Sequence, residues 1–97
     1  MLRTRFSDAI KQAMKAKETA RLSTLRLISA AIKDRDIAAR NEETSEGVSE
    51  DEILGVLAKM IKQRQDSAKA YEEAGRLELA ESELAEIKVI AEFLPKQ

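Results

Sequence analysis

The chain has 97 residues with no Cys, His or Trp, and 36% of its residues are charged. This length allows one domain with a modest core, and the missing residue types exclude disulfides, thiolate chemistry, an imidazole base and the usual zinc sites. No apolar run approaches the roughly 18 residues of a membrane helix, and Met1 is not followed by an apolar signal core. We therefore expect a cytoplasmic protein that uses no membrane, metal or cofactor.

The formal charge of −1 is unevenly spread along the chain. Residues 1–40 carry a net +6, residues 41–55 carry −6, and the remainder carries −1. A basic front end of this kind fits contact with a phosphate backbone. The alternative is that these charges only solvate the outer faces of helices.

The first half of the sequence predicts two helices, over 3–15 and 19–39. The first has one apolar arc that includes Phe6 and Ile10. The second has a main apolar stripe and a smaller one on the opposite side, formed by Ala20, Leu27, Ala31 and Ala38. Two stripes indicate either a central helix with several neighbours or a helix with a separate docking face.

Residues 49–76 predict a long third helix with a signal at each end. Ser49 and Glu52 have the spacing of a capping box, and Gly75 stands where a helix commonly ends in a left-handed residue. A fourth helix should begin near Arg76 or Leu77 and run to about Phe93, because Pro95 disfavours helical geometry before it. The polar, acidic segment 41–48 predicts a loop. The expected fold is a compact all-α bundle of about four helices, with an αα-hairpin at Gly75.

Two charged residues fall on apolar helix faces, Arg64 on the third helix and Glu83 on the fourth. Both lie within about eleven residues of Gly75, so a rise of about 1.5 Å per residue places them at similar heights in the hairpin. We predict an Arg64–Glu83 ion pair that is partly buried. It either sets the register between two helices or forms part of a ligand site.

Five cations are candidate RNA contacts: Arg21 and Arg26 on the second helix, and Lys59, Lys62 and Lys69 on the third. The alternative for the three lysines is that they only solvate an outer helix face. With only three aromatic residues, base stacking is not expected, which leaves contact with the backbone of a folded RNA. Val89 and Phe93, with Ala85, are predicted to form a small exposed apolar strip that could dock a neighbour. No nucleophile elbow or glycine-rich phosphate loop is present, so no catalytic residue is assigned.

Several motifs together resemble the GatB/YqeY-domain family, and specifically its small YqeY-like members. Residues 62–97 contain the motifs K-Q-R-x-D-S, A-G-R-x-x-L-A, an E-x-x-E pair formed by Glu83 and Glu86, and the terminal L-P-K-Q. Upstream, the stretch MKAKETARLSTLRLISAAIKD at 14–34 matches the first helical pair of the family. The resemblance implies an all-α N-terminal helical domain over 1–97. It also implies a small C-terminal helical domain that these residues do not contain. The Val89/Phe93 strip would be the surface on which that domain packs.

A related segment forms the tail of the B subunit of the tRNA-dependent amidotransferase, where the chemistry lies elsewhere. The resemblance therefore implies a non-catalytic module, accessory in tRNA or aminoacyl-tRNA metabolism. Its partners would be tRNA or a complex of a tRNA synthetase or the amidotransferase. Two alternatives stay open. One is a protein-interaction scaffold that does not bind RNA. The other is a carbon–nitrogen ligase with glutamine as amido donor, the activity that the family label carries.

Overall fold

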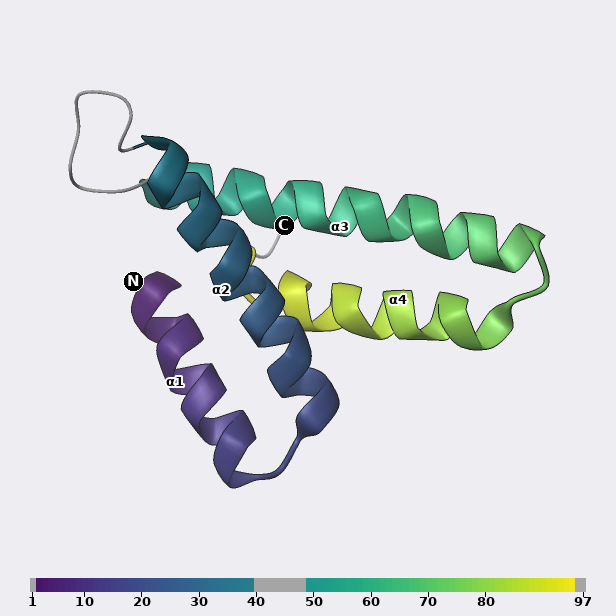
Figure 1. Ribbon diagram of the computed structural model, residues 1–97, viewed down its shortest axis with the longest axis horizontal. Coiled ribbons are helices and arrows are strands. Elements are labelled where there is room, and N and C mark those ends of the chain that lie inside the picture. Colours follow the sequence, from purple (N-terminus) through teal and green to yellow (C-terminus); the bar gives the residue numbers. More distant parts are fainter. Residues whose placement is uncertain (1, 40–48, 96–97) are drawn as a thin grey trace.

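The computed structural model describes residues 2–39 and 49–95 and arranges them as two helical hairpins. The first hairpin pairs α1 (Leu2–Lys15) with α2 (Thr19–Ala39), and the second pairs α3 (Glu50–Glu73) with α4 (Leu77–Ala91). Figure 1 shows α2 crossing the second hairpin, whose far end extends beyond the first. The all-α bundle of four helices is therefore confirmed. The predicted loop at 41–48 lies outside the described residues.

Both hairpins turn through the same backbone motif at the end of their first helix. At the α3–α4 joint, Gly75 has φ +75°, its N–H donates to Glu72, and Arg76 N–H donates to Tyr71 at 2.8 Å. At the α1–α2 joint, Lys17 takes the left-handed position with φ +57°, and Glu18 N–H donates to Ala13 at 3.0 Å. Glycine adopts this conformation without strain, whereas a lysine does not.

The two joints predict different effects of substitution at their left-handed positions, Gly75 and Lys17. Gly75→Val should lower the free energy of unfolding by more than about 1 kcal/mol, because a β-branched residue is strained at positive φ. Nothing lies within 4 Å of an added Cβ at Gly75, so the loss would come from the backbone and not from a clash. Lys17→Gly should leave stability unchanged or raise it by up to about 1 kcal/mol. Urea denaturation checks both, and an unchanged midpoint for Gly75→Val would contradict a joint that requires positive φ at this position.

The third helix begins as predicted. Ser49 is its N-cap, and the Ser49 Oγ accepts a hydrogen bond from Glu52 N–H at 3.2 Å. The Glu52 carboxylate lies 3.8 Å from the Arg35 guanidinium on α2. The start of α3 is therefore held to the end of the first hairpin by charge.

The core lies where the two hairpins cross, and every helix contributes to it. Its fully buried large side chains are Leu25, Ile28, Ile53, Leu57 and Ile90. α2 packs against each of the other three helices, as the central interpretation of its two stripes predicts. Its main stripe is buried, while Leu27 on the second stripe is 43% exposed.

The predicted exposed strip at the end of α4 is wrong. Phe93 is only 5% exposed, and its ring packs edge-on against Phe6 with the ring centroids 4.7 Å apart. Val89 is partly buried against the same core. α4 was expected to bury one side only, but near its C-terminal end it packs against α3 on one side and the first hairpin on the other. The exposed leucines of α4 are Leu77, Leu79 and Leu84 instead.

Candidate functional site

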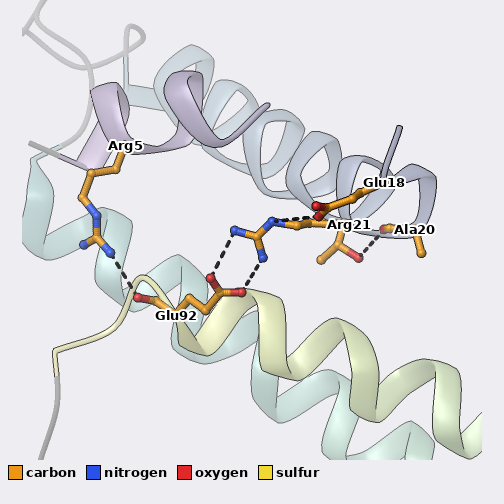
Figure 2. Close-up of polar contacts among 6 residues, drawn as sticks. Arg5, Glu18, Ala20, Arg21 and Glu92 are labelled. Carbon is orange, nitrogen blue, oxygen red and sulfur yellow. Dashed lines mark hydrogen bonds and ion pairs between the residues drawn. The ribbon is translucent and has the colours of Figure 1, made fainter. Parts of the chain in front are cut away.

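The junction of α1, α2 and α4 is organised around Glu92, as Figure 2 shows. Both terminal nitrogens of Arg21 donate to the Glu92 carboxylate, one of them at 3.1 Å. Arg5 donates to the Glu92 carbonyl at 3.1 Å, and its guanidinium lies 5.1 Å from the centroid of the Phe93 ring. The hydrogen bond to Glu92 raises the pKa of Arg21, so this side chain stays charged. The cluster joins the first hairpin to the end of α4.

Arg21 therefore links α2 to the end of α4. Its role as an RNA contact stays a prediction, and the side chain lies on the side of α2 that faces α4 and is 28% exposed. A bidentate arginine–carboxylate pair leaves few donors for a phosphate.

The other predicted RNA contacts are divided between two helices. Arg26 lies on α2, whereas Lys59, Lys62 and Lys69 lie on α3. Lys62 donates to Asp66 one turn along the same helix at 2.8 Å, and both side chains are well exposed. An exposed pair of this kind contributes little and leaves the cation available to solvent. Arg26, Lys59 and Lys69 are exposed, and no ion pair engages them within the described residues.

The two hairpins differ sharply in charge. Residues 2–39 carry nine Lys or Arg against four Asp or Glu, whereas residues 49–95 carry six against eleven, so the net charges are +5 and −5. Within the described residues, the exposed cations of the first hairpin whose side chains make neither an ion pair nor a hydrogen bond are Lys11, Lys15, Lys17, Arg26 and Lys33. Arg26 and Lys33 are seven residues apart and share one face of α2. The excess of positive charge in the first part of the sequence is thus carried by the first hairpin.

The predicted ion pair of Arg64 is formed with a different partner. Arg64 Nε lies 3.6 Å from a carboxylate oxygen of Glu86, not of Glu83, and the two side chains are 15% and 27% exposed. Arg64 Nη1 donates to the Met60 carbonyl at 3.0 Å, while Nε is buried and makes no hydrogen bond within the described residues. In an antiparallel hairpin, residues equally far from the joint lie side by side. Arg64 and Glu86 are each eleven residues from Gly75, whereas Glu83 is eight away.

A pocket of about 360 Å³ lies between α2 and α4. Its walls are mostly small side chains, with Ala20, Ser23 and Thr24 on α2 and Ser82, Ala85, Glu86 and Val89 on α4. The Thr24 and Ser82 hydroxyls donate to carbonyls of their own helices, so neither is an activated nucleophile.

Among the described residues, no group of acidic side chains is arranged to hold a metal, and no helix is long and apolar enough to span a membrane.

Comparison with known families confirms the resemblance. Residues 3–97 match the family described as Yqey-like protein. The curated relatives include "Altered inheritance of mitochondria protein 41, mitochondrial" from Clavispora lusitaniae, which is 36% identical over 88% of this chain and 46% of that protein. The proteins of the same name from Vanderwaltozyma polyspora and Kluyveromyces lactis are each 34% identical, over 88% and 87% of this chain and 44% and 43% of theirs. The chain spans less than half the length of these relatives.

These names contradict the predicted cytoplasmic location, because they point to mitochondria. The prediction rested on the missing apolar signal core and the missing membrane span. Mitochondrial targeting segments are amphipathic and basic, not apolar. Neither observation therefore bears on mitochondrial import.

Proposed function

Because the chain belongs to the YqeY-like family, we propose that it is a non-catalytic helical module that contacts tRNA through its first hairpin. The observation that supports this proposal is the separation of charge, +5 on residues 2–39 and −5 on residues 49–95. Lysine and arginine that are exposed and not held in ion pairs can each neutralise a phosphate and release its counterion. The acidic second hairpin would repel the same backbone, so the charges favour one orientation of the RNA.

The proposal predicts tRNA binding that weakens steeply with salt. The fluorescence anisotropy of a labelled tRNA should show binding at 50 mM NaCl that falls by more than tenfold by 200 mM. The double variant Lys11→Glu/Arg26→Glu should weaken binding at least tenfold. It should also lower the slope of log K against log salt concentration by about 2, because each lost phosphate contact reduces that slope by about 0.9.

The matched control carries the same change of charge on the other hairpin, Lys59→Glu/Lys69→Glu. All four residues are exposed, so neither double variant should disturb the core. The control should retain most of the binding. No binding at 50 mM salt, or an equal loss in both variants, would contradict the proposal.

A second candidate function, a protein-interaction scaffold, is favoured by the leucines of α4. Leu77 and Leu84 are 63% and 43% exposed and lie seven residues apart, on one flank of the helix. A scaffold would retain its protein partner after nuclease treatment and lose it in Leu77→Ser/Leu84→Ser. Retention of that partner without any tRNA binding would favour the scaffold over the RNA module.

We also propose that amide transfer is not an activity of these residues. The polar contacts described above are helix caps, ion pairs and hydrogen bonds to helix carbonyls, and none of them activates a nucleophile. Glutamine- or ammonia-dependent amidation of Glu-tRNA by the purified chain would contradict this proposal.

A further inference from the structure

The side of α4 that faces neither α3 nor the first hairpin has a regular pattern of its own. Its five members recur at steps of four and three along the helix and are all exposed: Leu77, Glu81, Leu84, Lys88 and Ala91. Figure 1 shows the first hairpin crossing near the C-terminal end of α4, and the pocket between them is lined on another side of the helix by Ala85 and Val89. We call the five exposed residues the α4 flank.

The two charges of the α4 flank have no partner in their own chain. Glu81 and Lys88 make no ion pair and no side-chain hydrogen bond within residues 2–39 and 49–95. They are about 10.5 Å apart along the helix axis, so they cannot pair with each other. Leu84 lies between them and is 43% exposed. The flank thus presents an apolar centre with a carboxylate toward its N-terminal end and an ammonium toward its C-terminal end.

This order of charges is complementary to its own reverse. If two copies of α4 lie antiparallel about a two-fold axis between Leu84 and Ala85, each Glu81 comes level with Lys88 of the other copy. The same register places the two Leu84 side chains together and sets Leu77 against the small Ala91. A parallel arrangement would instead bring Glu81 to Glu81 and Lys88 to Lys88, and such like-charge contacts are unfavourable.

We propose that the chain forms a symmetric dimer through the α4 flank, with two antiparallel α4 helices in contact and two Glu81–Lys88 ion pairs between the copies. Because α4 has 15 residues, one pair of such helices is smaller than a standard interface of about 800 Å² per partner. We therefore expect a weak dimer with a dissociation constant of about 100 µM. Such a dimer is not populated at the few micromolar of a circular dichroism experiment. The proposal does not rest on RNA binding.

Sedimentation equilibrium of the full chain in 50 mM NaCl, between about 10 µM and 1 mM, measures this association. The weight-average mass should rise from 10.8 kDa toward twice that value. Lys88→Glu should raise the dissociation constant at least tenfold, because it sets two carboxylates against each other in both pairs, and Glu81→Lys should do the same with two ammonium groups. The double variant Glu81→Lys/Lys88→Glu should return the constant to within about threefold of its original value, since exchanging the two charges restores both pairs.

Two matched controls test whether the α4 flank itself is responsible. Lys59→Glu makes the same change of charge on α3, and Leu27→Ser removes from α2 a leucine that is as exposed as Leu84. Both should leave the dissociation constant within about threefold of its original value, whereas Leu84→Ser should raise it at least tenfold. Circular dichroism should show that all variants keep their helices.

A monomer at every concentration would overturn the proposal and leave the leucines of α4 to another protein. A dimer that the double variant fails to restore would also overturn it, and so would one that Leu27→Ser weakens as much as Leu84→Ser.

Discussion

Replacing Phe93 with alanine is expected to lower the free energy of unfolding by about 3–4 kcal/mol. The substitution removes a buried ring, which costs about 3–5 kcal/mol in well-packed cores, and it also removes the edge-on contact with Phe6. For a domain of this size, each 1 kcal/mol shifts Tm by about 4–8 °C. The melting temperature measured by circular dichroism should therefore fall by at least about 12 °C.

Two further variants make this result specific. Phe93→Leu keeps most of the apolar volume and should recover more than half of the loss. Leu84→Ala removes a leucine that is 43% exposed and should change stability by less than about 0.5 kcal/mol. If Phe93→Ala melted like Leu84→Ala, Phe93 would belong to an exposed strip after all.

Local signals explain most of what the sequence predicted correctly. Ser49 and Gly75 mark the ends of α3 through contacts with residues at most four positions away, so the helix limits follow from the chain alone. The periodic apolar faces also predicted buried positions, such as Phe6 on the apolar arc of the first helix. These features depend on spacing along one helix and not on the arrangement of helices.

The predictions that were wrong concern residues whose burial or ion pair depends on a second helix. A helical wheel gives α4 one inner side, yet near Phe93 the helix is covered by α3 and by the first hairpin. Toward Gly75 it is covered by α3 alone, so Leu77 and Leu79 stay exposed. The ion pair of Arg21 was missed because nothing in the sequence showed that Glu92, 71 positions later, would lie beside it.

The Arg64–Glu86 ion pair connects α3 to α4 inside their shared face, and a double-mutant cycle measures its contribution. Glu86→Leu should cost about 2 kcal/mol, because it leaves a guanidinium that is 15% exposed without its carboxylate. Deeply buried pairs lose about 3–5 kcal/mol when one partner is removed, and the remaining exposure reduces that cost here. Arg64→Met should cost less, since the methionine stem replaces the apolar part of the arginine and Glu86 is nearer to solvent.

The cycle distinguishes the observed pair from the one predicted at Glu83. Urea denaturation of Arg64→Met, Glu86→Leu and the double variant should give a coupling free energy of about 1 kcal/mol. The parallel cycle with Glu83→Leu should give less than about 0.5 kcal/mol, because Glu83 lies about 4.5 Å closer to the joint along the helix axis. The antiparallel register about Gly75 places Glu86, and not Glu83, beside Arg64, so the coupling free energy with Glu86 should be the larger. Stronger coupling at Glu83 would mean that α4 is displaced by almost one turn against α3.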